Sequence, residues 1–582
     1  MPPSRLKKEL CMHFCHGRRS LLLVSLQAFL LLFLASQHAF AQGGEPQYFA
    51  IRGARVVPVS GPPMENATVV IARGVITAVG KDVAIPPEVW VIDGKGLIVY
   101  PGLIDSFTDV GIPAAPPAGG SEGGGGGGPR RMQVGGASGP QDRPGSTPWR
   151  NAADEVSLTD KRIESWRSAG FTTVVSAPKG GFFPGQAAVL DLAGERAGDL
   201  VVKSPVAIPV SVQPAGGFGS GFPDSLMGGL SYVRQVWLDT EWSAKAEAIY
   251  EKNPRGVQRP RYDRTEAALA DALEDHALVL IPANNTVQIR RALELADRWK
   301  VRGVLYGGQM AYETAPELAA KKLPILVNLK WPEAKKDADP EDKPSLRTLR
   351  FRDRAPSAPA ALAKVGVKFA FYSGGITTPK DILKAVKKSV DAGLAPDAAL
   401  RALTLSSAEI FGVADRLGSL DNGKIANLVV TDGDLFAEKT KIKFVFVDGR
   451  KFEIREPEKP KDPPKGDITG KWELAYTTPE GPEESTADLT MDKDGTVSGT
   501  VTGKRGTTTI ISGYASADKF SFTINIPIQD SPADVVFSGT FDATSLKGSI
   551  AVQGFSIDFT GTKPSSNSLA ANETTNVEGD AR

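Results

Sequence analysis

Cysteine is almost absent from this sequence. The 582 residues include two, Cys11 and Cys15, and both lie close to the N-terminus. Beyond Cys15 the chain has no thiol, which excludes a disulfide framework, a cysteine nucleophile and a cysteine-ligated metal from that part of the protein.

Histidine is nearly as scarce. Of four histidines, three precede residue 42, and His276 alone lies in the rest of the chain. A catalytic triad needs a histidine beside its nucleophile. His276 stands just before a strand-like run, ALVLIPA, and we expect it at the end of a helix and at the bottom of the predicted fold. A histidine-dependent nucleophile is therefore excluded.

Excess charge and long apolar runs are also lacking. The formal net charge is +1, whereas nucleic-acid-binding proteins usually carry a concentrated basic excess, so we expect no nucleic-acid partner. The apolar run Leu21–Leu34 is too short to span a bilayer comfortably, and no later run reaches 18 residues. We therefore expect no transmembrane helix in the mature protein.

The N-terminus has the pattern of a signal peptide. Basic residues (Lys7, Lys8, Arg18 and Arg19) precede the apolar run, and Ala39-Phe40-Ala41 fits a cleavage site. We predict removal of residues 1–41, a mature chain that begins at Gln42, and a periplasmic or secreted protein. The arginine pair also fits a loose twin-arginine signal, which would imply folding before export.

The chain is long enough for three or four folded units. Residues 42–99 contain short β-branched runs. Residues 100–413 alternate strand-like runs with helical patterns, one of which starts at Thr378-Pro379 and ends at Gly393. Eight buried strands separated by helices predict an α/β fold, a (β/α)₈ TIM-like barrel. The predicted strands are Gly102–Asp105, Thr172–Ser176, Ala187–Asp191, Val206–Val212, Leu278–Ala283, Gly303–Tyr306, Ile325–Leu329 and Val367–Tyr372.

Two stretches lack the apolar residues that a core needs. Residues 113–148 are rich in Gly and Pro and predict a mobile loop after the first barrel strand. Residues 456–466, with EPEKPKDPPK, predict a semi-rigid linker. Between this linker and a polar, disordered tail at 564–582, residues 467–563 alternate with period two and predict an all-β barrel or sandwich.

Two motifs carry a resemblance to a known family. Tyr100-Pro101-Gly102-Leu103-Ile104-Asp105 resembles the start of the first barrel strand in the metal-dependent amidohydrolase superfamily. LSSAEIFGVADRLGSLDNGKIANLVVTDGDLF (405–436) and KFVFVDGR (443–450) resemble that family's closing segment. The resemblance implies that 42–99 and 414–455 form one small composite β-sandwich. The helix at LELADRWK and the Gly-Gly pair after Tyr306 resemble the imidazolonepropionase-like branch.

The resemblance also implies a chemistry, metal-assisted hydrolysis of non-peptide C–N bonds. The family's ligands are a His-x-His pair after strand one, a carboxylated Lys on strand four, histidines after strands five and six, and an Asp after strand eight. This chain departs from that pattern at nearly every position. Phe107 and Asp109 replace the pair, VAIPVSV ends without a Lys, and the later strand ends offer Pro282, Tyr306-Gly307-Gly308 and Ser373-Gly374. We therefore predict no metal cofactor, although the family uses zinc or another divalent metal.

Asp109 is the candidate catalytic residue that remains. Asp105 has a structural counterpart in the family, whereas Asp109 could act on water or hold a weak, hard cation, or could simply be a hydrogen-bonded residue at a strand end. Around it we predict a pocket with aromatic walls and neutral polar groups, although the same residues could be ordinary packing. The predicted pocket residues are Phe107, Asp109, Asn284, Asn285, Tyr306 and Ser373, with Phe371 or Tyr372 as a further aromatic surface.

Three functions remain open. The first is a non-catalytic amidohydrolase relative that binds a small ligand or pairs with an active amidohydrolase partner chain. The second is an active hydrolase with an unconventional carboxylate centre at Asp109. The third treats the barrel as a scaffold for a binding module in the C-terminal β domain.

Overall fold

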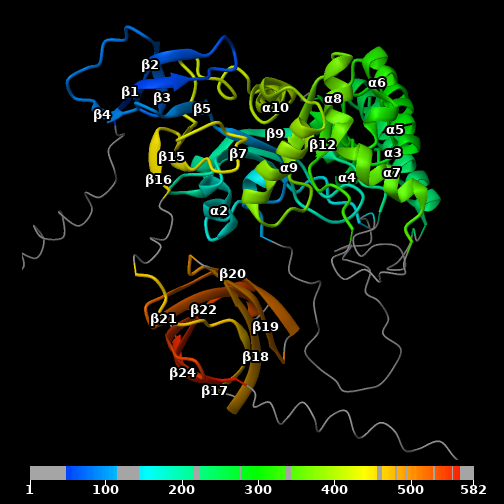
Figure 1. The fold of residues 1–582 in the computed structure, drawn as a ribbon. Coiled ribbons are helices and arrows are strands. Elements are labelled where there is room, and N and C mark those ends of the chain that lie inside the picture. Colours follow the sequence, from blue (N-terminus) through cyan, green and yellow to red (C-terminus); the bar gives the residue numbers. More distant parts are fainter. Residues whose placement is uncertain are drawn as a thin grey trace, which may run out of the picture. The chain divides into compact units, whose positions relative to one another are not determined.

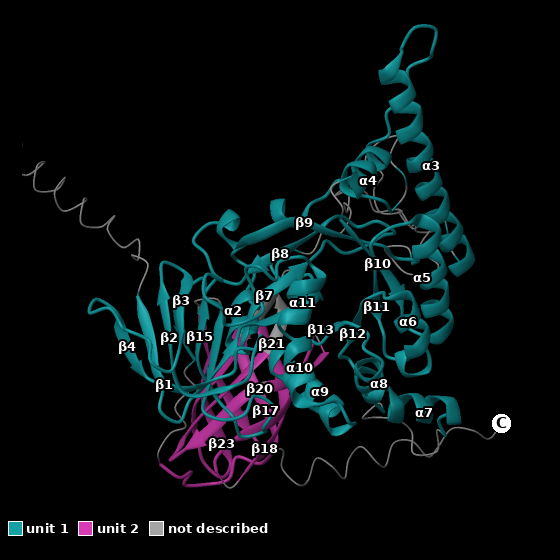
Figure 2. Ribbon diagram, turned by 90° about the horizontal axis from the view of Figure 1, so that it is seen from above, with its two compact units in different colours: residues 1–454 teal, residues 455–582 magenta. Residues whose placement is uncertain are grey.

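A computed structural model describes residues 48–113, 143, 145–213, 223, 225–274, 277–334, 343–454, 462–478, 481–492, 494–504, 506–528, 531–552 and 555–563. The predicted signal peptide, His276 and the predicted tail lie outside these residues. The chain divides into two compact units, residues 1–454 and 455–582 (Figure 2). No described helix combines the length and apolarity needed to cross a membrane.

Both flanks of the first unit contribute strands to one sheet (Figure 1). The antiparallel ladder between β5 and β14 joins the two parts. We predicted a sandwich, but the strands form one continuous eight-stranded sheet. It curls until β3 meets residues 423–426, and a buried apolar cluster fills its inside. The strands are β1 (Phe49–Val56), β2 (Met64–Ala72), β3 (Val75–Gly80), β4 (Trp90–Asp93), β5 (Ile98–Pro101), β14 (Leu428–Thr431), β15 (Ile442–Val447) and β16 (Arg450–Glu453).

A second eight-stranded sheet forms a nearly closed, TIM-like barrel. Its strands follow sequence order, and each of the eight coincides with or overlaps a predicted strand. The edge strands meet where the Ser373 backbone N–H donates to Asp105 Oδ1 over 2.9 Å. The strands are β6 (Leu103–Thr108), β7 (Phe171–Ser176), β8 (Ala187–Asp191), β9 (Val201–Pro209), β10 (Leu278–Ala283), β11 (Gly303–Gly307), β12 (Ile325–Asn328) and β13 (Phe369–Tyr372).

The prediction of a regular (β/α)₈ barrel is wrong at β8. This strand runs antiparallel to both neighbours, β7 and β9. The described connections on either side of it, 177–186 and 192–200, contain no α-helix. Parallel neighbours need a crossover of roughly a dozen residues or more, usually helical, so these short connections favour antiparallel pairing. The barrel therefore has seven strands in one direction and one in the other.

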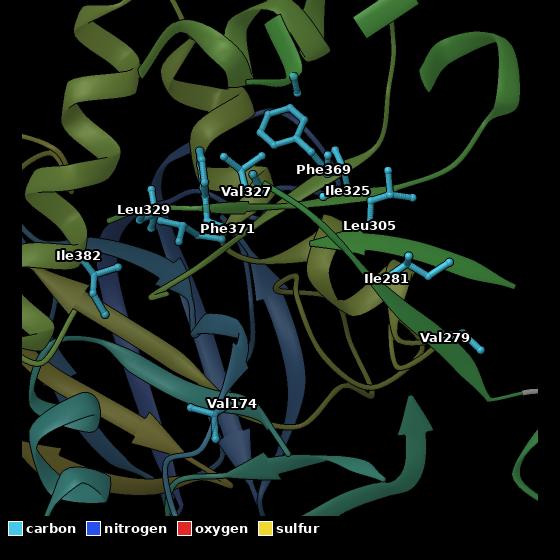
Figure 3. Close-up of a cluster of buried hydrophobic side chains, with 14 of the residues drawn as sticks. Val174, Val279, Ile281, Leu305, Ile325, Val327, Leu329, Phe369, Phe371 and Ile382 are labelled. Carbon is cyan, nitrogen blue, oxygen red and sulfur yellow. The ribbon is translucent and has the colours of Figure 1, made fainter. Parts of the chain in front are cut away.

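Helices pack around the barrel strands. Side chains from β10 to β13 point outward into an apolar layer that Ile382 of α9 joins (Figure 3). The α-helices are α2 (Arg162–Ser168), α3 (Leu226–Lys252), α4 (Arg264–Glu274), α5 (Thr286–Trp299), α6 (Ala315–Lys321), α7 (Leu346–Arg354), α8 (Ala358–Lys364), α9 (Pro379–Asp391), α10 (Pro396–Ala402) and α11 (Leu405–Ile410). Short 3₁₀ helices cover Ala152–Asp154, Ala197–Leu200, Ala311–Glu313 and Ala355–Ser357.

The end of the predicted loop at 113–148 is held in place. Arg143 forms ion pairs with Asp239 at 2.7 Å, with Asp263 at 3.1 Å and with Glu266. Thr147 pairs with the Phe183 carbonyl through its backbone N–H. Composition alone suggested a free loop because it does not show these distant partners. Residues 114–142 and 144 lie outside the described part of the chain.

The second unit is a closed, up-and-down barrel of eight antiparallel strands. Its interior holds phenylalanine rings and Trp472. Residues 462–466, which we assigned to the linker, bond to this barrel instead, since Lys465 N–H donates to the Ala517 carbonyl over 2.7 Å. The strands are β17 (Gly470–Thr478), β18 (Gly481–Met491), β19 (Val497–Gly503), β20 (Gly506–Ser516), β21 (Lys519–Ile528), β22 (Ser531–Phe541), β23 (Ser545–Val552) and β24 (Phe555–Thr562).

Candidate functional site at the barrel mouth

A cavity of about 410 Å³ opens beside the carboxyl ends of β6 and β13. Active sites of TIM barrels lie at this face of the fold. Phe107, Asp109 and Ser373, which we predicted from the sequence, line it together. The further lining residues are Thr108, Arg162, Trp166, Ala177, Lys179, Asn328, Tyr372, Gly374, Gly375, Ile376 and Thr377.

Asp109 forms ion pairs with two basic side chains. Its Oδ1 lies 3.1 Å from Arg162 Nη1 and 2.9 Å from Lys179 Nζ. Arg162 also donates to the Asp109 and Ile112 carbonyls and to Asp160, so it fixes the loop after β6. Both ion pairs use the same carboxylate oxygen, so Oδ1 of Asp109 is already engaged by side chains of the protein.

Phe107 stands at the other predicted position of the metal-binding pair. Its ring centroid lies 5.1 Å from that of Tyr306 and 5.8 Å from that of Tyr372. Burial raises the pKa values of both tyrosines, so each ring stays neutral. Tyr306 also donates a hydrogen bond to the Val210 carbonyl over 2.8 Å. The three aromatic rings belong to one apolar cluster, in which Phe107 and Tyr372 also line the cavity and Tyr306 does not.

Asp105 joins the strands rather than facing a ligand. It is almost fully buried, and it accepts hydrogen bonds from Trp166 Nε1 at 3.1 Å and from the Ser373 backbone N–H. Burial raises the pKa of its carboxyl group, while these hydrogen bonds oppose the shift. Asp105 therefore positions β6, α2 and β13 around the cavity.

Asn284 and Asn285 do not belong to this cavity. They line a separate hollow of about 880 Å³ near α5 and α7. Asn285 caps α5, since its Oδ1 accepts the Gln288 backbone N–H over 3.0 Å. Tyr306 touches Phe107 but does not line the mouth cavity, and Phe371 faces the apolar layer outside the barrel while Tyr372 faces the cavity.

Sequence reasoning missed Arg162 and Lys179. A signal for both was present, because Lys179 follows β7 closely and Arg162 opens the helix that leads into it. In a βα unit, residues just after a strand and at the start of the next helix lie at the active face. Neither residue occupies a position at which the family has a metal ligand, and the expected site residues were all at such positions or next to them.

The described strand ends do not fit a catalytic metal. Zinc sites use about three nitrogen, sulphur or carboxylate ligands around an open position. Within the described residues, no three His, Cys, Asp or Glu side chains converge in a way that could hold a metal ion. The residues at the ends of β10, β11, β12 and β13 are Asn284, Gly308, Leu329 and Ser373.

Comparison with known proteins agrees with this fold. The model of the amidohydrolase family matches residues 317–452. The structure of an amidohydrolase from Thermotoga maritima MSB8 is similar at a TM-score of 0.56 and 22% identity, over 70% of this chain and 100% of that one. Residues 317–452 thus match the amidohydrolase family, and the Thermotoga structure shows that the likeness of fold extends over 70% of the chain. Its resemblance to the imidazolonepropionase-like branch stays a prediction.

Another similar structure is an adenosine deaminase from Xanthomonas campestris with bound zinc. It has a TM-score of 0.40 and 15% identity, over 72% of this chain and 95% of that one. A search of the curated proteins gives no match. The relation of this protein to the amidohydrolases therefore stands on the family match over residues 317–452 and on the fold shared with the Thermotoga structure.

Proposed function

We propose that this protein is a non-catalytic relative of the amidohydrolases and binds a small ligand at its barrel mouth. The observation that carries the proposal is the state of Asp109, whose Oδ1 lies within 3.1 Å of both Arg162 and Lys179. The neighbouring position holds the packed Phe107 ring. These residues supply a shaped cavity, but they leave no free imidazole or carboxylate to activate water.

The lining of the cavity favours an anionic ligand. Lys179 is 69% exposed, and an exposed ion pair contributes little, on the order of 0–1 kcal/mol. Its ammonium can therefore turn from Asp109 to a bound carboxylate at little cost, while Arg162 continues to neutralise Asp109. The rings of Phe107, Trp166 and Tyr372 supply an apolar wall for the body of such a ligand.

Metal analysis tests the non-catalytic part. We expect less than about one-tenth equivalent of zinc, manganese or iron after purification without chelator, because tight binding needs deprotonated ligands that this site lacks. Hydrolysis of dihydroorotate, imidazolone and dipeptide substrates should stay at background with added metal. Phe107→His combined with Asp109→His should restore neither binding nor turnover, since the other strand ends still lack ligands.

One result would favour the unconventional hydrolase instead. It is a near-stoichiometric metal ion together with turnover that Asp109→Ala abolishes. Turnover that survives Asp109→Ala would contradict both that alternative and the proposed non-catalytic site, whereas metal without turnover would contradict the hydrolase and the expected absence of metal.

A matched pair of probes tests the ligand class. Benzoate and benzamidinium have similar size and opposite charge, and Trp166 in the cavity reports on both through its fluorescence. We expect saturable benzoate binding that Lys179→Met weakens at least about fivefold, which corresponds to roughly 1 kcal/mol. Lys203→Met, a lysine remote from the lining residues, serves as the control. Binding of benzamidinium in preference to benzoate would overturn the anionic assignment.

Two further hypotheses from the sequence stay predictions. The signal-like segment supports a periplasmic or secreted protein. The C-terminal barrel carries a groove of about 1140 Å³ that hydroxyl and charged side chains line, and this groove gives a binding module in that domain a possible location.

A further inference from the structure

The second half of α3 is exposed or half-exposed along its whole length in the described structure. Its first half buries Val233, Val236, Trp237 and Thr240. From residue 241 to residue 262, however, no residue is buried. Figure 2 shows α3 extending beyond the helices and strands near it and ending in a loop. Isolated helices of roughly a dozen residues are marginal in water, so this arm needs a partner surface.

Large apolar side chains lie on one side of this arm. Leu238 is 55% exposed, Trp242 is 70% exposed and Ile249 is 62% exposed. At about 100° per residue, their spacing of four and seven residues places them within about 40° of one another around the helix. The same spacing defines the seam of a coiled coil, with Lys245 at the intervening seam position.

We propose that this stripe binds the same stripe of a second copy of the chain, in an antiparallel pair of α3 helices. The proposal is independent of the barrel-mouth ligand. With the two-fold axis between residues 243 and 244, Leu238 lies opposite Ile249 of the second copy. Trp242 then lies opposite Lys245 of the second copy, which is a favourable cation–π arrangement.

The flanks of the stripe also fit this pairing. Asp239 and Glu241 lie opposite Ala248 and Ala246 of the second copy, so no like charges oppose each other there. The small alanines leave room for the tryptophan ring between the helices. Glu247 and Glu251 fall on the outer side of the helix by the same seven-residue count. Antiparallel helices also bring opposite ends of their dipoles together.

A groove lies where the tip of the second arm would reach. This hollow of about 310 Å³ runs between the first half of α3 and α5. The same axis places Lys252, the last residue of α3 in the second copy, beside Gln235, so the loop that follows it, in which Val257 is 43% exposed, starts next to Arg234 of the groove. The arm of each copy thus meets the groove of the other, as a two-fold interface requires.

The size of the interface sets the expected affinity. A 27-residue helix is about 40 Å long, so a strip roughly 10 Å wide buries on the order of 800 Å² in total. This area lies below the roughly 1,200–2,000 Å² that stable interfaces bury, in the range of weak and transient ones. We therefore expect a reversible dimer with a dissociation constant in the range of about 1–100 μM.

Sedimentation of the full chain across that concentration range tests the dimer. Trp242→Ala should weaken dimerisation at least about tenfold, because it removes the largest contact at the centre of the seam. Trp90→Ala is the matched control, since Trp90 is 72% exposed on β4 and lies outside the stripe. A protein that is monomeric at about 100 μM, or a dimer that Trp242→Ala leaves unchanged, overturns the proposal.

Disulfide cross-linking tests the orientation. In a chain with Cys11→Ser and Cys15→Ser, no cysteine remains. An equimolar mixture of Leu238→Cys and Ile249→Cys chains should cross-link on mild oxidation, because the antiparallel register brings these two positions together. Either chain alone should not, because its two cysteines would lie about 16 Å apart along the helix pair. Cross-linking of the single variants in place of the mixture overturns the register.

Discussion

Asp109 shows at the scale of single residues what the sequence could and could not predict. Its place at the end of the first barrel strand follows from the PGLID motif, and the structure places it in the mouth cavity. Its ion pairs with Arg162 and Lys179 could not be read from that motif, since these partners come from later segments. The side chains at a strand end can be predicted from the local sequence, but their ion-pair partners depend on the tertiary fold.

Asp191 carries a pH-dependent contribution to stability. Burial raises the pKa of its carboxyl group to about 7, although Thr173 and Asn427 donate hydrogen bonds to it. An unfolded aspartate has a pKa of about 3.9. The folded state therefore holds a proton that the unfolded state releases, and the contribution is complete below pH ~4 and lost as the pH rises through 7.

We predict that Asp191→Asn stabilises the protein at pH 8 by up to roughly 4 kcal/mol, from about three pKa units at 1.4 kcal/mol each. At pH 4 the variant should match the unsubstituted protein, because both side chains are then neutral. Thermal unfolding at the two pH values measures the difference, with the exposed Asp391→Asn as control. A stabilisation that is equal at both pH values would contradict this account.

At the scale of elements, strand β8 and helix α9 show which structural features could be predicted from the sequence and which could not. The cap and proline at Thr378-Pro379 predicted the start of α9, and the structure confirms a helix at Pro379–Asp391. The position of β8 was predicted as well, but its direction was not, since apolar periodicity carries no direction. The signal for direction was the length of the connections, which are too short for helical crossovers. The position of a strand can be predicted from its residues, whereas its direction depends on the length of the connections to its neighbours.

Arg143 ties three elements together, and its removal should loosen all of them. Its guanidinium group forms ion pairs with Asp239 in α3, with Asp263 just before α4 and with Glu266 in α4. Removal of the arginine leaves three carboxylates that repel one another. The loss of one partner from a fully buried ion pair costs several kcal/mol, and we expect a smaller cost for this partly buried network. We predict that Arg143→Met destabilises the first unit by about 2 kcal/mol and speeds thermolysin cleavage near Trp149.

Arg196→Met is the control for this prediction. Arg196 pairs with Asp199, but its side chain is 85% exposed, so its loss should leave the stability nearly unchanged. Equal effects of the two substitutions on cleavage and on thermal unfolding would show that the Arg143 network does not hold the segment.

At the scale of the whole molecule, composition predicted that an α/β unit is followed by an all-β unit, but it did not predict at which residue the all-β unit begins. A run of Pro, Lys and Glu separates a region of alternating strands and helices from one with period-two patterning only, and the chain divides there into units 1–454 and 455–582. The boundary of the barrel could not be read as well, because residues 462–466 are polar and Pro-rich. Their bonds to the barrel use backbone groups, which composition does not report.

These bonds predict where the C-terminal domain begins. Lys465 N–H donates to the Ala517 carbonyl at 2.7 Å, Ala517 N–H donates to the Pro463 carbonyl at 3.2 Å, and Ser516 Oγ donates to the Asp462 carbonyl at 2.9 Å. At about 1 kcal/mol each, less the cost of ordering the segment, they should contribute roughly 1–2 kcal/mol.

We therefore expect fragments 462–563 and 467–563 both to fold alone, because the eight strands close on themselves and leave no open edge. The longer fragment should melt higher by roughly 5–15 °C, given about 4–8 °C per kcal/mol for a domain of this size. Thermal circular dichroism of the two fragments measures the difference, and Ser516→Ala in the longer one should account for part of it. Equal melting temperatures would mean that residues 462–466 only lie against the barrel, and an unfolded longer fragment would mean that the barrel depends on the first unit for its stability.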